Sequence, residues 1–398
     1  MIPTSSRGRT ASIESDPSDG SEVSTNPQTM AIREYRTSDD SAIARLNERF
    51  RAAGTTHVQY AGSSNDSVTA RAHRERLFVV TDGDEIRGGA FLREVPIAIG
   101  DDVTTIGWVK YPLAESQIDR AFSGVPAALL LQLLREQPQL AALGMGGHAG
   151  AFAQLLSRLR WEGSTIRTFI CPLRPHVVAT ALPHLKRTPS LRRFARIFHA
   201  SGLAHFASAV APSLVRARNR TLLRSSMLVP VDAFLTGFDA LWGEARAAYP
   251  AIGVRDTSAA GWRFPPSAPG MQRFEVRRGG ALIGWFVLQV VNLREVGDAS
   301  PYGPLKLGVL HDCLAIPSDA ATVSAWALDV LLARGADLAL ANHSHSAWHD
   351  AMRRVGFLTG PESFAYYRAP ATKRTFALHG VDPTQLYVTR GDDGLLAF

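Results

Sequence analysis

Three histidines lie within seven positions of the stretch 341–357: His343, His345 and His349. His345 and His349 are one helical turn apart, a spacing at which two imidazoles can chelate zinc. The glutamate that accompanies such a pair in zinc hydrolases is missing, and no third ligand is evident nearby. The pattern therefore favours a polar helix face that contacts substrate, through His345 and the preceding Asn342, over a metal site.

Proton transfer near neutral pH needs a side chain that can hold or release a proton at that pH. The candidates are Asp312 and His311 in the segment LHDCLA, Glu115 after a strand of the first half, and His345. We expect Asp312, His311 and Glu115 to be the catalytic residues. A purely orienting or structural carboxylate is an equal alternative for Asp312.

A second cluster, Trp262-Arg263-Phe264, stands before two prolines. An aromatic ring next to an arginine can stack on a sugar or clamp an anionic acceptor. We therefore expect Trp262 and Arg263 to contact the acceptor substrate. The alternative is a loop that is anchored by one buried tryptophan.

The positive charge of the chain is concentrated in one segment. The net charge is +7, and the span 183–224 carries arginines and lysines but no acidic residue. Its basic residues are Lys186, Arg187, Arg192, Arg193, Arg196, Arg216, Arg218, Arg220 and Arg224. Within it, Leu191, Phe194, Ile197 and Phe198 recur at helical spacing. Such a basic amphipathic helix can lie on an anionic membrane, bind RNA phosphates, or simply pack between two domains.

The remaining composition describes a globular protein. With 398 residues the chain is long enough for two domains, and its two cysteines, Cys171 and Cys313, indicate a reducing compartment and hence the cytoplasm. Peripheral attachment to the inner face of the membrane, through residues 186–224, is compatible with this location. No stretch is long and apolar enough for a transmembrane helix. Residues 1–29 are polar and predicted to be a disordered tail.

The order of predicted elements occurs twice along the chain. Each half reads β–α–β–β–β–α–β–α–β, the first over 30–180 and the second over 226–398, with a basic amphipathic linker over 181–225. In the first half the last five of these elements fall at 103–114, 123–138, 140–147, 149–161 and 165–173. In the second half they fall at 305–316, 319–335, 337–342, 346–357 and 363–370. The sequence predicts an α/β protein with two similar mixed sheets, one in each half.

Each half resembles the Gcn5-related N-acetyltransferase (GNAT) fold. The marker is the segment 337–368, with a late strand, a helix, the closing Gly356-Phe357 pair and a final strand. Two such halves resemble the tandem group that includes Fem-type aminoacyl transferases and acyltransferases of surface polysaccharides. The resemblance implies an acyltransferase that moves an acyl group from acetyl-CoA or another acyl-CoA to an amine or hydroxyl acceptor. It also implies a surface-polysaccharide precursor as the source of that acceptor.

The family binds the CoA pyrophosphate on a Q/R-x-x-G-x-G/A loop at a helix N-terminus. The first half has DRAFSGVPAALL there, so the implied cofactor residues are Arg120, Ser123, Gly124, Val125 and Ala127. Pro126 stands in place of the second glycine and has no N–H to donate. The family's tyrosine acid is replaced by Met352 in the second half and by Leu156 in the first. These departures leave two alternatives open: a Fem-like transferase that uses charged tRNA, and a non-catalytic binding module.

Overall fold

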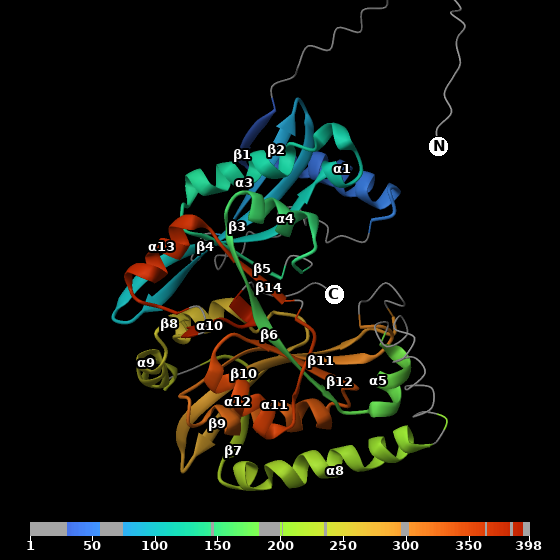
Figure 1. Ribbon diagram of the computed structural model, residues 1–398, viewed down its shortest axis with the longest axis vertical. Coiled ribbons are helices and arrows are strands. Elements are labelled where there is room, and N and C mark those ends of the chain that lie inside the picture. Colours follow the sequence, from blue (N-terminus) through green and yellow to red (C-terminus); the bar gives the residue numbers. More distant parts are fainter. Residues whose placement is uncertain are drawn as a thin grey trace, which may run out of the picture.

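A computed structural model gives the fold of the protein (Figure 1). It describes residues 30–55, 75–144, 147–182, 200, 202–234, 237–295, 302–362, 364–382 and 385–392. The predicted tail 1–29 and the predicted amphipathic helix around Phe194 and Phe198 lie outside these residues.

The N-terminal half follows the predicted order of elements. Its long strands β3 and β4 form the centre of a sheet, with α1 packed on one face and α3 and α4 on the other. The elements are β1 (Ala31–Glu34), α1 (Asp40–Ala52), β2 (Glu75–Asp82), β3 (Glu85–Ile99), β4 (Asp102–Ala114), α3 (Val125–Glu136), β5 (Leu140–Gly144), α4 (Ala151–Arg158) and β6 (Glu162–Pro172). Short 3₁₀ turns, η1 (Thr37–Asp39), η2 (Glu115–Gln117) and η3 (Arg120–Phe122), join some of them.

The C-terminal half repeats this order and adds elements of its own. The repeated elements are β7 (Met227–Val231), α9 (Phe238–Ala248), β9 (Met271–Arg278), β10 (Ala281–Asn292), β11 (Lys306–Ala315), α11 (Ala320–Ala333), β12 (Leu338–His343), α12 (Ser346–Val355) and β14 (Phe364–Arg368). The additions are β8 (Ala251–Gly253), α10 (Thr257–Arg263), β13 (Leu358–Thr359), α13 (Pro370–Leu378), β15 (Leu386–Tyr387) and η6 (Arg390–Asp392). Between the halves, α5 (Pro175–Ala181) and α8 (Leu203–Arg224) pack against each other.

The two halves exchange their closing strands. The hydrogen-bonded order is β1-β2-β3-β4-β5-β14-β6-β12-β11-β10-β9-β7. Strand β14 of the C-terminal half lies between β5 and β6, whereas the second part of β6 pairs antiparallel with β12, from His343–Arg167 to Leu338–Pro172. The expectation of two separate sheets is therefore wrong. Each exchanged strand covers an edge that would otherwise be left with unpaired backbone groups.

Apolar side chains explain why α3 takes its position. Val125, Leu129, Leu130 and Leu133 recur at helical spacing, and all four are buried. They pack against the sheet in one core cluster with residues of β2, β3 and β4. The helix is thereby fixed with its N-terminus beside the end of β4.

Candidate active site

The central parallel strands of the N-terminal half separate where a bulge interrupts β4. The ladder between β4 and β5 runs only from Gly107–Leu140 to Val109–Ala142, although β4 continues to Ala114. Opposite β3 the register of β4 shifts at this point, and Tyr111 has a φ of 46°. A left-handed backbone is costly for a tyrosine, and strained positions of this kind cluster at functional sites.

A pocket of about 330 Å³ lies beside this bulge. Its floor is largely apolar, which suits the burial of a flexible, mostly hydrocarbon ligand segment. The walls come from β3, β4, α3 and α4, and polar side chains stand among them. The lining residues are Ala90, Val109, Pro112, Leu113, Ala114, Ser116, Gln117, Ser123, Pro126, Ala127, Leu129, Leu130, Leu133, Ala151, Phe152, Gln154, Leu155 and Arg158.

The N-terminus of α3 contributes to the wall of this pocket. Ser123 and Ala127, both expected from the sequence to bind a cofactor, line it, and Gly124 is the helix N-cap. The side chain of Val125 is buried in the core, so only the backbone N–H of this residue could contact a ligand. Arg120 is exposed on η3 but is not among the lining residues. Because Pro126 has no N–H, this helix start offers one donor fewer than usual.

The corresponding place in the C-terminal half is filled by the end of the described chain. The parallel ladder between β11 and β12 ends at Leu310–Ala341. Beyond it, Tyr387 donates its hydroxyl hydrogen to the Cys313 carbonyl oxygen at 2.7 Å, and Arg390 Nε donates to Asn342 Oδ1 at 2.9 Å. The segment 385–392, which we call the C-terminal plug, therefore bridges the two strands where they separate.

The plug is held by a buried network of two arginines and two aspartates. Arg255 Nε lies 3.1 Å from Asp312 Oδ1, and its Nη2 lies 2.7 Å from Asp392 Oδ2. Arg263 Nη1 lies 3.1 Å from Asp392 Oδ1 and 3.6 Å from Asp312 Oδ2. Thr389 adds a hydroxyl bond to Asp312 at 2.9 Å. All four charged side chains are almost completely inaccessible to solvent, so their charges are balanced within the protein.

The pKa values of the two carboxyl groups are shifted in opposite directions. Burial raises the pKa of Asp312 above its ordinary value, and the charge of Arg255 opposes that shift. Burial also acts on Asp392, but there Arg255 and Arg263 outweigh it and lower the pKa. Asp312 thus lies inside a closed network, a position typical of a structural carboxylate.

The other two residues expected to be catalytic also lie away from open solvent. His311 is fully buried, with Nε2 3.3 Å from Gln289 Oε1, and burial together with the charge of Arg390 lowers its pKa to about 3. Glu115, on η2, forms ion pairs with Arg49 and with Arg87, the latter at 3.1 Å. Its neighbours in the chain, rather than Glu115 itself, line the pocket.

The histidine cluster serves the local fold. His345 is the N-cap of α12 and its Nδ1 accepts a hydrogen bond from the Ala347 N–H at 3.2 Å. His349 Nε2 lies 2.8 Å from the carbonyl oxygen of His343. The ring of His343 stacks on the ring of Trp348, with 5.1 Å between the ring centroids. Among the residues that the structure describes, no three histidine, cysteine or acidic side chains are arranged to hold a metal ion.

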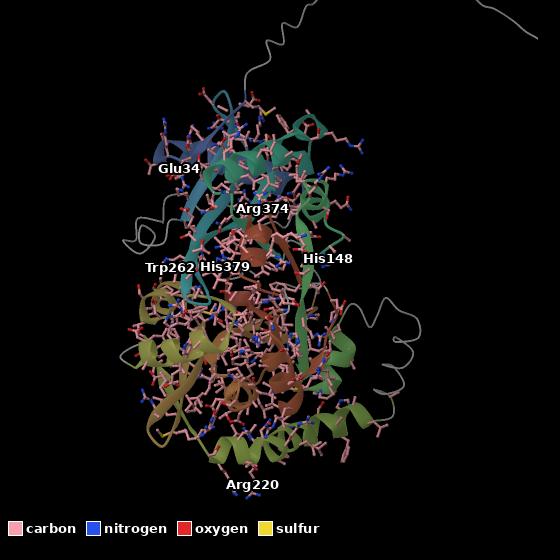
Figure 2. All side chains as sticks on the ribbon, turned by 60° about the vertical axis from the view of Figure 1, so that its left-hand side comes forward. Glu34, His148, Arg220, Trp262, Arg374 and His379 are labelled. Atoms are coloured by element: carbon pink, nitrogen blue, oxygen red, sulfur yellow. The ribbon has the colours of Figure 1, made fainter. Side chains whose placement is uncertain are left out.

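The fold separates the residues that were expected to contact the acceptor substrate. Arg263 belongs to the buried network, and Asn342 donates to Thr168 Oγ1 at 2.9 Å across the exchanged strands. Only Trp262 remains partly exposed, and the guanidinium of Arg93 from the N-terminal half lies 4.4 Å from the centre of its ring. Figure 2 shows Trp262 at the level where the two halves meet.

Comparison with known proteins identifies the fold. No protein-family model matches the sequence, and no curated protein matches it significantly. Several solved structures resemble the chain, among them the three described next. A probable N-acyltransferase from Enterococcus faecalis is 6% identical with a TM-score of 0.50, over 86% of this chain and 73% of that one. A GCN5-related N-acetyltransferase from Anabaena variabilis is 11% identical with a TM-score of 0.51, over the same shares.

The third structure is the N-myristoyltransferase of Saccharomyces cerevisiae, crystallised with myristoyl-CoA. It is 11% identical with a TM-score of 0.50, over 87% of this chain and 80% of that one. At such low identity these likenesses show the fold alone. The chain therefore has a GNAT fold of mixed α/β type, which confirms the fold class expected from the sequence.

Sequence reasoning missed the parts of the site that come from distant segments. The sequence gives no sign of the C-terminal plug. Residues 385–392 show no hydrophobic periodicity, and Asp392 is 137 positions from its partner Arg255. Arg158 was also missed. It lies three positions after Leu155 on the strongly amphipathic helix α4, so the helical spacing of that segment could have placed both side chains on the same side of the helix.

Proposed function

We propose that the chain is an acyltransferase whose N-terminal half binds an acyl-CoA in the pocket between β4, α3 and α4. The acyl group would pass to an amine or hydroxyl of a second substrate. The observation that carries this proposal is the pocket itself: it lies at the N-terminus of α3, beside the bulge of β4, in a chain with a GNAT fold.

The chemistry of the pocket supports an acyl-CoA as the donor substrate. Its apolar wall, which includes Leu129, Leu130 and Leu133, suits a pantetheine arm or an acyl chain. An anionic group would meet the positive end of the α3 dipole and the guanidinium of Arg158. The N–H groups of Val125 and Ala127 would be its backbone donors.

In the transfer itself, the nitrogen or oxygen of the acceptor would attack the thioester carbonyl. The new C–N or C–O bond forms as the C–S bond breaks, and the proton of the acceptor ends on the departing thiol. The protein would hold the acyl-CoA in position for the attack. It would also supply N–H groups that donate hydrogen bonds to the developing oxyanion. We assign the oxyanion role to the backbone of β4 around Tyr111.

Finer features of the reaction rest on the sequence resemblance. We propose acetyl as the acyl group and a surface-polysaccharide precursor as the source of the acceptor. A second candidate function is a non-catalytic binding module of the same fold. The missing N–H of Pro126 favours it, because one backbone donor for the CoA phosphates is lost. Release of free thiol from acetyl-CoA, measured with and without amino sugars, separates the two candidates.

Calorimetric titration with acetyl-CoA tests the donor site. In the variant Gly124→Glu a carboxylate stands where the phosphates would approach. A side chain at Gly124 meets no atom within 4 Å, and the backbone there is helical, so the fold should be kept. Repulsion of a few kcal/mol at short range in a partly screened site predicts an affinity loss of at least about tenfold.

The matched control is Gly243→Glu. Gly243 lies on α9 of the other half, and a side chain there also meets no atom within 4 Å. We expect this variant to bind acetyl-CoA as the native chain does. Equal affinity of Gly124→Glu and Gly243→Glu would place any donor site elsewhere.

A further inference from the structure

The longest helix of the described chain, α8, lies across the end of the C-terminal half (Figure 1). Its inner face packs on α11 and α12, and Asn219 donates from Nδ2 to the Val355 carbonyl oxygen at 3.0 Å. Val215, Leu222 and Leu223 on the same face contact the main core. This side of the helix is therefore fully used by the fold.

The outer face of α8 is also apolar. Leu203, Phe206 and Leu214 are 56%, 67% and 64% exposed. Their spacing of three and eight residues brings them onto one side of a helix, opposite the buried Asn219. Every other helix or strand among the described residues exposes at most one large apolar side chain. An apolar stripe of this kind indicates a partner surface.

Positive charge accompanies this stripe. Arg216 pairs with Asp329 at 2.9 Å, and Arg218 donates to the backbone carbonyls of Arg353 and Arg354 at the end of α12. Arg220 and Arg224 are exposed, and within the described part of the chain neither has an acidic partner. Figure 2 shows Arg220 at the outer end of the molecule, directed away from it.

We propose that the outer face of α8 docks on an anionic lipid bilayer. Leu203, Phe206 and Leu214 would enter the boundary between headgroups and acyl chains, and Arg220 and Arg224 would meet lipid phosphates. A second copy of this chain fits less well, because α8 has no acidic residue to pair with the same arginines. No described helix is apolar and long enough to cross a bilayer, so the helix would lie in the interface.

The position of α8 has a consequence for the rest of the chain. Figure 1 shows α3 at the opposite end of the molecule from α8. A docked chain would therefore hold the pocket at α3 away from the bilayer, accessible to water-dissolved ligands. Docking should leave any affinity for acyl-CoA unchanged.

Vesicle flotation at about physiological ionic strength tests the proposal. The probes are vesicles of phosphatidylcholine with about one third phosphatidylserine, and vesicles of phosphatidylcholine alone. We expect the full chain to float with the anionic vesicles and not with the neutral ones. Phe206→Ser with Leu214→Ser should weaken this binding at least about tenfold. Arg220→Glu with Arg224→Glu should abolish it, because each lost arginine costs about fivefold before repulsion is added.

The matched control is Leu358→Ser with Leu378→Ser, which removes two leucines outside α8 that are 57% and 86% exposed. It should float like the native chain. Absence of flotation of the native chain with anionic vesicles would overturn the proposal, as would undiminished flotation of Phe206→Ser with Leu214→Ser. A native dimer that this variant converts to a monomer, with no vesicle binding, would assign the stripe to self-association instead. None of these measurements involves acyl-CoA, so they are independent of the proposed function.

Discussion

The hydroxyl of Thr389 donates a hydrogen bond to Asp312 Oδ1 at 2.9 Å, inside the separation between β11 and β12. In the N-terminal half a pocket lies beside the end of the corresponding strand β4, between that strand and the helices α3 and α4. The two halves thus repeat one order of elements but differ at the place that could hold a ligand. In one half the place is open, and in the other the chain occupies it with its own C-terminal plug.

This difference predicts the stoichiometry of ligand binding. If an acyl-CoA binds at the N-terminus of α3, the chain should bind one molecule, since the plug already bridges Cys313 and Asn342 in the other half. Equilibrium dialysis with saturating acetyl-CoA measures the ratio. Two equivalents per chain would mean that the plug leaves its place, and would contradict a permanent structural role.

Replacement of Asp312 by asparagine should damage stability rather than chemistry. It leaves Arg255 and Arg263 with Asp392 as the one remaining carboxylate of the network, and an uncompensated buried charge costs about 3–5 kcal/mol. Denaturant unfolding of Asp312→Asn measures this loss. Asp329→Asn is the control, because it breaks a more exposed pair with Arg216 and should cost less than about 1 kcal/mol.

The opposite outcome would restore a catalytic role for Asp312. A variant Asp312→Asn that unfolds like the native chain, binds acetyl-CoA equally well and yet fails in transfer would require the carboxylate to act on the reaction. The measurements therefore separate the two interpretations that the sequence left open.

Arg158 gives a test of the pocket that needs no change at the helix start. Its exposed guanidinium lines the wall, so Arg158→Ala should lower the affinity for acetyl-CoA by up to about fivefold, the value of one exposed ion pair. The effect should shrink at high salt, because exposed charges are screened. Arg160→Ala, two positions further along and outside the pocket lining, is the control and should change nothing.

The elements could be read from the sequence because their causes are local. The spacing of Leu129, Leu130 and Leu133 specifies one face of α3, and Gly356 ends α12 with a φ of 115°, a conformation that favours glycine. These local rules carry the order of elements, which is why the fold class was predicted correctly.

The pairing of distant segments could not be read in the same way. The order of elements is the same whether β14 closes its own sheet or that of the other half, so the exchange left no trace in the periodicity. Arg263 shows the same limit. Its neighbour Trp262 made it look like an acceptor contact, but its partners Asp312 and Asp392 come from 49 and 129 positions further along and enclose it.

Two buried histidines should make the chain sensitive to mild acid. Burial lowers the pKa of His311 and of His343 to about 3, whereas a histidine in the unfolded chain titrates near 6.5. Both are thus neutral in the folded protein, and below about pH 6.5 the unfolded chain binds protons that the folded chain does not. The stability that they contribute is present above that pH and is lost as the pH falls.

At pH 5 each of these histidines should cost about 2 kcal/mol, so their joint contribution to the free energy of unfolding should fall by about 4 kcal/mol between pH 7 and pH 5. Urea unfolding at the two pH values measures the difference. His311→Gln keeps a partner for Gln289 and cannot titrate, so it should lose about half of the pH dependence. His379→Gln is the matched histidine substitution at an exposed site, because its imidazole is more than a third exposed. An unchanged slope in His311→Gln would mean that His311 is protonated or solvated in the folded chain, which contradicts its complete burial.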